Sequence, residues 1–95
     1  MRTSLDRSRK AIEIFDEKIL EILWLRMGET KIIGKYKIKR GLPVKDLERE
    51  RQLINSLIDK GKQMGMRSEV VESVFKAIIT ESCKEQENQF RENNA

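Results

Sequence analysis

Cationic side chains interrupt the side of the first predicted helix that should be apolar. Residues 5–40 lack proline, and one seam recurs there about every 3.5 residues, as on a buried helix face. The seam consists of Arg9, Ile12, Asp16, Ile19, Leu23, Arg26, Thr30, Ile33 and Lys37. Inward cations are costly unless something anionic meets them. The pattern therefore raises the question of which anion meets Arg9, Arg26 and Lys37.

The three cations do not share one direction. Arg26 and Lys37 are eleven residues apart, which at about 100° per residue brings them within roughly 20° of the same face. Arg9 precedes Arg26 by seventeen residues, so on a straight helix it lies about a quarter-turn away. Arg26 and Lys37 are therefore expected to face one site together, with Arg9 facing elsewhere.

The composition excludes several kinds of chemistry. The 95 residues include no histidine and one cysteine, Cys83, so a Ser-His or Cys-His pair, a zinc site and an internal disulfide are excluded. We expect no metal and no cofactor. There is no signal-peptide pattern and no apolar run near 18 residues. These features favour a cytoplasmic protein without a membrane span.

The elements that must position these residues are predicted to be helices in one domain, residues 1–95. One proline, five glycines and 5% aromatic residues favour an all-α fold. We expect a helix over 5–40 ending at Gly41-Leu42-Pro43, a second from 44–46 to about 62, and a third from Ser68 as N-cap. Residues 35–39 alternate like a strand, which is the local alternative. Residues 1–4 and 91–95 are expected to be disordered.

The first helix is too long for a compact chain of this size. Thirty-five residues span ~53 Å, whereas a compact 95-residue globule is only about 32 Å across. The helix must overhang its own chain, and a second copy is needed to cover the overhang. We therefore expect an intertwined homodimer of three-helix chains. Trp24 would crowd the dimer seam if it pointed inward.

Positive charge is concentrated in the middle of the chain. Residues 31–51 contain eight Lys/Arg against three Asp/Glu, a local net charge of +5. Such a segment can bind nucleic acid or a small anionic ligand, or it can form a solvated face. The segment has a single aromatic residue, Tyr36, so aromatic residues are not interleaved along the cations as base stacking would require. Nucleic acid is therefore not an expected partner.

One set of residues recurs in a distinctive order over the three predicted helices. It consists of Arg9, Asp16-Glu17-Lys18, Arg26, Gly34-Lys35, Lys37, Pro43-Val44, Asp46, Arg49-Glu50-Arg51, Ile78-Ile79, Ser82 and Gln86. This order resembles that of the all-helical chorismate mutases, above all the mutase domain of bifunctional chorismate mutase-prephenate dehydratases. Each motif alone is weak, since a cation on a helix is common, but the whole set lies in register, and the resemblance covers residues 5–88 without a gap.

The resemblance implies an interwoven dimer that rearranges the dianion chorismate to prephenate without covalent or acid–base catalysis. Arg26 and the partner subunit's Arg9 would bind the two carboxylates, because a guanidinium presents forked donors. Lys37 would bridge a carboxylate and the ether oxygen, to which Gln86 would also donate. By the same resemblance, Glu50 and the backbone near Asp46 would bind the substrate hydroxyl. Ser82 would help to bind a carboxylate, and Arg49 would organise the charged groups around the site.

Two other functions are compatible with these residues. An isochorismate pyruvate lyase on the same scaffold would bind a related dianion with a similar set of cations. The combination of Asp46 with Arg49-Glu50 favours the mutase, because it matches the mutase's hydroxyl-binding arrangement. A non-catalytic helical interaction protein is the alternative from another class, and taken singly each polar residue could be an ordinary surface or core-edge position.

Overall fold

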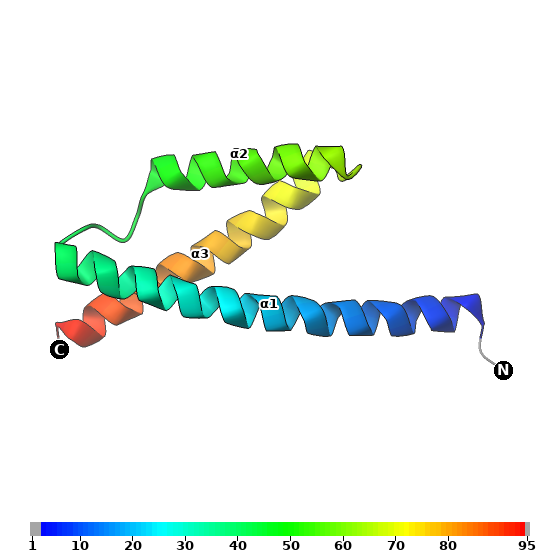
Figure 1. Cartoon of the computed structure of the whole chain (residues 1–95), viewed down its shortest axis with the longest axis horizontal. Helices are drawn as coiled ribbons and strands as arrows, with labels where there is room; N and C mark the ends of the chain where they lie inside the picture. The colour runs from blue at the N-terminus through cyan, green and yellow to red at the C-terminus, as the bar shows by residue number, and fades with distance from the viewer. Residues whose placement is uncertain (1–2, 95) are drawn as a thin grey trace.

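The computed structural model describes residues 3–94 as three α-helices, with α1 at Ser4–Arg40, α2 at Leu47–Gln63 and α3 at Ser68–Asn93 (Figure 1). No strand occurs among these residues, which confirms the predicted all-α class. Residues 35–39, the alternative strand, belong to α1. None of the described helices combines the length and apolar character that crossing a membrane requires.

Local capping sets both ends of α1. Thr3 and Asp6 form a capping box, in which the Asp6 N–H donates to Thr3 Oγ1 (3.1 Å) and the Thr3 N–H donates to Asp6 Oδ2 (3.2 Å). At the other end Gly41 adopts a left-handed conformation with φ 67°, which glycine reaches without a Cβ penalty. The expected end at Gly41 is thus confirmed.

The ends of the other helices differ in part from the expectation. Asp46 caps α2 by accepting from the Arg49 N–H at 3.0 Å. Ser68 is the first residue of α3 rather than its N-cap, which is Arg67 and makes no side-chain capping bond. A β/extended backbone at Arg67 (ψ 139°) starts the helix there without a polar cap.

The termini are more ordered than we expected. Ser4 begins α1, because the capping box satisfies the first free N–H groups, and α3 continues through Asn93 rather than ending near residue 90. Residues 1, 2 and 95, which we also expected to be disordered, lie outside the described part of the chain.

α3 is the central helix of the described chain. It packs on α1 and on α2, whereas α1 and α2 do not approach each other closely within residues 3–94. The apolar side chains that are buried in the described chain are Val71 (5% exposed) and Ile79 (8%), both on α3. A Cβ at Gly61 would lie 2.7 Å from Val71 Cγ2, so the glycine permits the close approach of α2 to α3.

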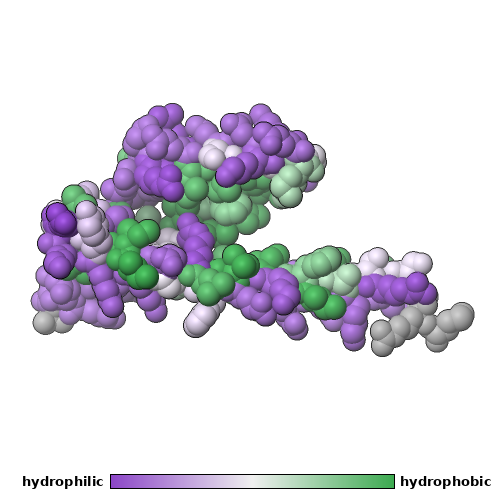
Figure 2. Space-filling view, in the orientation of Figure 1, coloured by the Kyte–Doolittle hydropathy of each residue, from purple (hydrophilic) through white to green (hydrophobic). Residues whose placement is uncertain are grey.

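The N-terminal half of α1 extends past the rest of the chain (Figure 1). The molecule measures 58 × 28 × 15 Å, with a radius of gyration of 17.2 Å, against about 12 Å for a compact chain of this length. Large apolar residues on this overhang are more than half exposed, and green patches lie along it in Figure 2. They are Leu5, Ile12, Ile14, Phe15, Ile19, Leu20 and Ile22. Trp24 is 76% exposed in the protomer.

Candidate active site

One cavity of about 330 Å³ is lined by residues of all three helices and of the connection between α1 and α2. Its volume falls in the range of small-molecule sites. Seven of the eight predicted site residues line it. They are Arg26 and Lys37 on α1, Asp46, Arg49 and Glu50 at the start of α2, and Ser82 and Gln86 on α3.

Arg26 is oriented by α3. Its Nη1 donates to Ser82 Oγ at 2.5 Å, and that hydroxyl in turn donates to the Ile78 carbonyl one turn earlier at 3.0 Å. Both side chains are partly buried. Since a guanidinium has five N–H donors, most of those on Arg26 are free for a ligand.

Lys37 and Gln86 form the best-connected part of the cavity. Lys37 Nζ donates to the Val44 carbonyl (2.6 Å) and to Gln86 Oε1 (2.9 Å), and Gln86 Nε2 donates to the Thr30 carbonyl (3.1 Å). Gln86 is only 5% exposed. An ammonium has three donors and a carboxamide nitrogen has two. Each group therefore keeps one N–H for a ligand in the cavity.

The first turn of α2 contributes acceptors. Asp46 Oδ1 is occupied by the cap bond to the Arg49 N–H. Glu50 Oε1 lies 3.7 Å from Lys45 Nζ, while Glu50 Oε2 is buried and has no hydrogen-bond partner among the described residues. A buried, unpaired carboxylate oxygen is unfavourable, and a ligand hydroxyl donating to it would remove that penalty.

The cavity holds positive charge that the protein does not neutralise. Within residues 3–94, none of Arg26, Lys37 and Arg49 has a carboxylate oxygen within the 4.0 Å ion-pair distance. Arg26 and Lys37 are partly buried, and cations at such positions need an anion. The arrangement suits a small anion that also carries a hydroxyl group.

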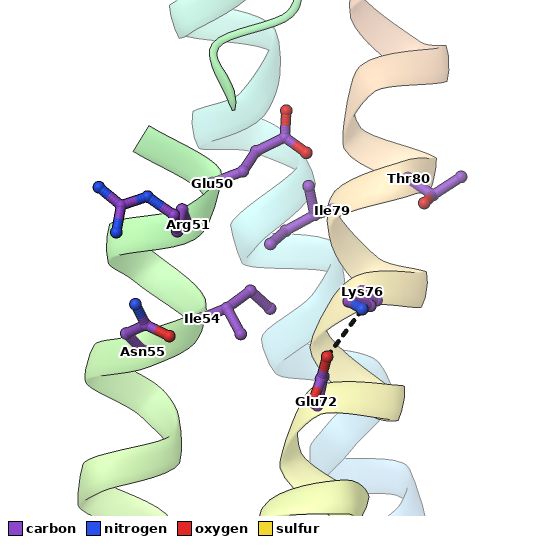
Figure 3. Close-up of a pocket in the computed structure, with 8 residues that line it drawn as sticks. All are labelled: Glu50, Arg51, Ile54, Asn55, Glu72, Lys76, Ile79 and Thr80. Atoms are coloured by element: carbon purple, nitrogen blue, oxygen red, sulfur yellow. Dashed lines mark ion pairs between the residues drawn. The ribbon is translucent and has the colours of Figure 1, made fainter. Parts of the chain in front are cut away.

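A larger cavity of about 450 Å³ lies between α2 and α3 and shares Glu50 and Ile79 with the first (Figure 3). Its cations are neutralised within the protein, because Lys76 pairs with Glu72 at 2.7 Å and Arg51 pairs with Glu48 at 2.6 Å. We therefore place the candidate site in the smaller cavity, where the charge is unpaired.

Several contributors to the site were not predicted from the sequence. The carbonyls of Thr30 and Val44 fix Gln86 and Lys37, and a backbone acceptor leaves no mark on residue type. Cys83 also lines the cavity. Burial raises the pKa of its thiol, the Glu50 carboxylate raises it further, and Lys45 and Lys37 lower it.

Arg9 is the one predicted site residue that the protomer does not bring to the cavity. It lies on the exposed N-terminal part of α1, seventeen residues before Arg26, which corresponds to about 26 Å along the helix. Its role in trans stays a prediction.

The fold and the cavity define an all-helical protein with a cationic cavity whose chemistry suits a small anion. The family model for chorismate mutase type II matches residues 8–87, and the chain belongs to this family. All eight predicted site residues lie inside the matched range. The family resemblance inferred from the sequence is thus confirmed.

Individual relatives agree with this assignment. The bifunctional chorismate mutase/prephenate dehydratase of Buchnera aphidicola subsp. Baizongia pistaciae is 29% identical over 94 residues, covering 99% of this chain and 25% of the relative. The protein of the same name from Escherichia coli K12 is 34% identical over 79 residues, covering 83% and 20%. The T-protein of Enterobacter agglomerans is 27% identical over 82 residues, covering 86% and 22%. The chain thus spans a fifth to a quarter of the length of these curated relatives.

Proposed function

We propose that the chain catalyses the rearrangement of chorismate to prephenate. The observation that carries the proposal is the pair of unneutralised cations, Arg26 and Lys37, beside the buried amide of Gln86, in a member of this family. The reaction breaks a C–O bond and forms a C–C bond within one dianionic molecule. It needs neither a nucleophile nor a proton shuttle, so a site without histidine suits it.

Catalysis would rest on positioning and on electrostatic stabilisation. The enzyme must hold the two bond-forming carbons close together, and it must stabilise negative charge that develops on the ether oxygen. Lys37 and Gln86 are hydrogen-bonded to each other, and the remaining N–H groups of both would donate to that oxygen. Their own bonds to Val44, Thr30 and each other keep them oriented before substrate arrives.

The remaining contacts would fix the substrate's orientation. Arg26 would bind one carboxylate, with Ser82 supporting both the guanidinium and that carboxylate. Glu50 would accept the substrate hydroxyl through its unpartnered Oε2, near the backbone of Asp46. Arg49 would organise the carboxylates and carbonyls around the site.

The second carboxylate would be bound by Arg9 of a partner subunit in an interwoven homodimer. An apolar groove of about 350 Å³ between α1 and α3, lined by Ile19, Ile22, Phe75 and Ile78 among others, is open in the protomer. It adjoins the exposed apolar overhang of α1. Soluble monomers rarely expose so large an apolar surface. The overhang of a second copy is itself apolar and is therefore suited to cover it.

The test is an absorbance assay for loss of chorismate with chromatographic identification of the product. We expect prephenate as product. Arg26→Ala should remove most of the activity, whereas Arg51→Ala, whose guanidinium already pairs with Glu48 at the other cavity, should leave it unchanged.

The other outcomes would each contradict the proposal. Pyruvate formed from isochorismate, without chorismate turnover, would identify a lyase. No turnover of either dianion by a folded protein would favour a non-catalytic helical interaction protein. Equal losses in Arg26→Ala and Arg51→Ala would move the site away from the smaller cavity.

A further inference from the structure

α1 and α3 approach each other closely at Gly34, a buried residue one turn after Thr30 and nearly one turn before Lys37. A Cβ on residue 34 would lie 1.9 Å from Gln89 Oε1, 2.8 Å from Gln89 Cδ and 3.2 Å from Gln86 Cγ. The space that any other residue would fill is therefore occupied by the side-chain amide of Gln89. Gln86 packs against the same glycine.

Gln89 repeats the contact that Gln86 makes. Its Nε2 donates to the Lys31 carbonyl at 2.9 Å, as Gln86 Nε2 donates to the Thr30 carbonyl at 3.1 Å. The two amides leave α3 three residues apart, on neighbouring positions of one face. They donate to the carbonyls of two consecutive residues of α1, Thr30 and Lys31.

The side-chain oxygen of Gln89 does not add a second hydrogen bond within the described residues. Within residues 3–94, Gln89 Oε1 is buried without a hydrogen-bond partner, which is unfavourable. A methionine would fill the same space without leaving a polar atom unpaired, but it could not donate to the Lys31 carbonyl. What glutamine supplies at this position is the hydrogen bond between the helices.

We propose that Gln89, seated on Gly34, is a positioning residue that sets how α3 lies on α1 and thereby aims the amide of Gln86 into the candidate site. Gln89 does not line the cavity, so it acts only through Gln86. The inference rests on the proposed function, because the aim of Gln86 matters for activity only if that amide meets the reacting oxygen.

The kinetic test uses Gln89→Met, Gly34→Ala and the double variant. Gln89→Met keeps the volume and removes the donor, and Gly34→Ala adds a Cβ that evicts the amide. Each should lower kcat about tenfold with KM changed less than about twofold, since small misplacements of a reacting group reduce turnover steeply. Because both changes break one contact, the double variant should be no slower than the slower single variant.

Gly28→Ala is the matched control. Gly28 is also inside α1, but a Cβ there would meet nothing within 4 Å, so turnover should equal that of the parent. Full kcat in Gln89→Met overturns the proposal, as does an additive loss in the double variant. A loss in Gly28→Ala equal to that in Gly34→Ala does so too, because it would indicate a general effect on α1.

A second measurement does not depend on turnover. In ¹⁵N spectra the side-chain amide signals of Gln86 should move in Gln89→Met and Gly34→Ala and stay in place in Gly28→Ala. If the parent fails to convert chorismate while these shifts occur, the proposed function is wrong and the positioning contact stands. If the parent is active and the Gln86 signals do not move, the positioning role is wrong.

Discussion

At the scale of the residue, Gln86 is held at both ends, by the Thr30 carbonyl at its nitrogen and by Lys37 at its oxygen. Glutamine donates at every accessible pH, whereas glutamate has nearly the same shape and donates only when protonated. An ionised glutamate in place of Gln86 would set a carboxylate against both the Thr30 carbonyl and the negative charge developing on the ether oxygen. Replacing the amide therefore tests the mechanism directly.

Gln86→Glu should be poorly active near about pH 7.5 and should recover as the pH falls. Position 86 is only 5% exposed, so burial and the substrate's negative charge should raise the pKa of the new carboxyl. The Lys37 ammonium beside it should lower that pKa. We expect recovery to follow one protonation with an apparent pKa above ~4.3. The measurement is kcat/KM between about pH 4.5 and 8 beside the parent, which should show no matching rise.

Gln86→Met is the control for this experiment, because it fills the same space and cannot donate at any pH. It should stay poorly active throughout the range. A flat profile for Gln86→Glu, or one that tracks the parent, would mean that Gln86 is not the donor to the ether oxygen. The mechanism would then have to rest on Lys37 alone.

Cys83 offers a chemical probe of the same cavity. Burial and Glu50 raise the pKa of its thiol, and only the thiolate reacts with alkylating agents. Alkylation by iodoacetamide should therefore be slow at neutral pH and should accelerate only above the ordinary cysteine range. In Glu50→Gln the pKa should fall and the rate–pH curve should shift to lower pH. An unshifted curve would show that Glu50 does not act on the thiol.

At the scale of the element, the sequence was enough to place the three helices but not all their ends. Periodic apolar residues and the Gly41-Pro43 signal predicted where α1 ends, because these features act locally. The start of α3 was misplaced by one residue, since Arg67 begins it without a side-chain cap. The end of α3 was placed too early, because the polar residues after Phe90 do not continue the apolar stripe from which the helix was predicted.

The lining of the candidate site could likewise be predicted only in part, because residue types indicate side chains but not backbone contacts. Side chains with unusual placement, such as Arg26 and Lys37, could be inferred from periodicity, and they line one cavity. The carbonyls of Thr30 and Val44 could not, because every residue has a carbonyl and only the packing of helices decides which one is used. The same holds for Gly34, whose contact with Gln89 depends on the crossing of α1 and α3.

The close packing of α2 on α3 at Gly61 leads to a prediction about stability. Alanine normally stabilises a helix interior by about 1 kcal/mol relative to glycine. Here a Cβ would lie 2.7 Å from Val71 Cγ2, and Val71 is 5% exposed, so overpacking should cost about 1–3 kcal/mol. We expect Gly61→Ala to lower the free energy of unfolding by about 1 kcal/mol in thermal or denaturant unfolding.

Gly28→Ala is again the matched comparison, because its Cβ would meet open space. It should raise stability, which gives the two alanine variants opposite signs. Gly61→Ala combined with Val71→Ala should show a favourable coupling, since the smaller side chain relieves the contact. If Gly61→Ala proved as stabilising as Gly28→Ala, α2 and α3 would not be packed as tightly as the structure shows.

At the scale of the whole molecule, the proposed homodimer rests on two features of the single chain. Its first helix is longer than the rest of the fold, and apolar side chains line the overhang. Its cavity contains Arg26 and Lys37, while Arg9 lies far along the same helix. One arrangement would explain both the exposed overhang and the distance of Arg9 from the cavity. In it, the overhang of each chain covers the apolar groove of the other.

That arrangement predicts complementation between two damaged chains. Arg9→Ala and Arg26→Ala should each be nearly inactive, but in a mixed dimer one site would carry both lesions and the other neither. An equal mixture with free exchange should therefore regain about one quarter of the parent's sites. Mixing Arg26→Ala with Lys37→Ala should restore nothing, because both residues serve the site of their own chain. Exchange is followed by native mass spectrometry, and if mixed dimers form without any return of activity, Arg9 does not act in trans.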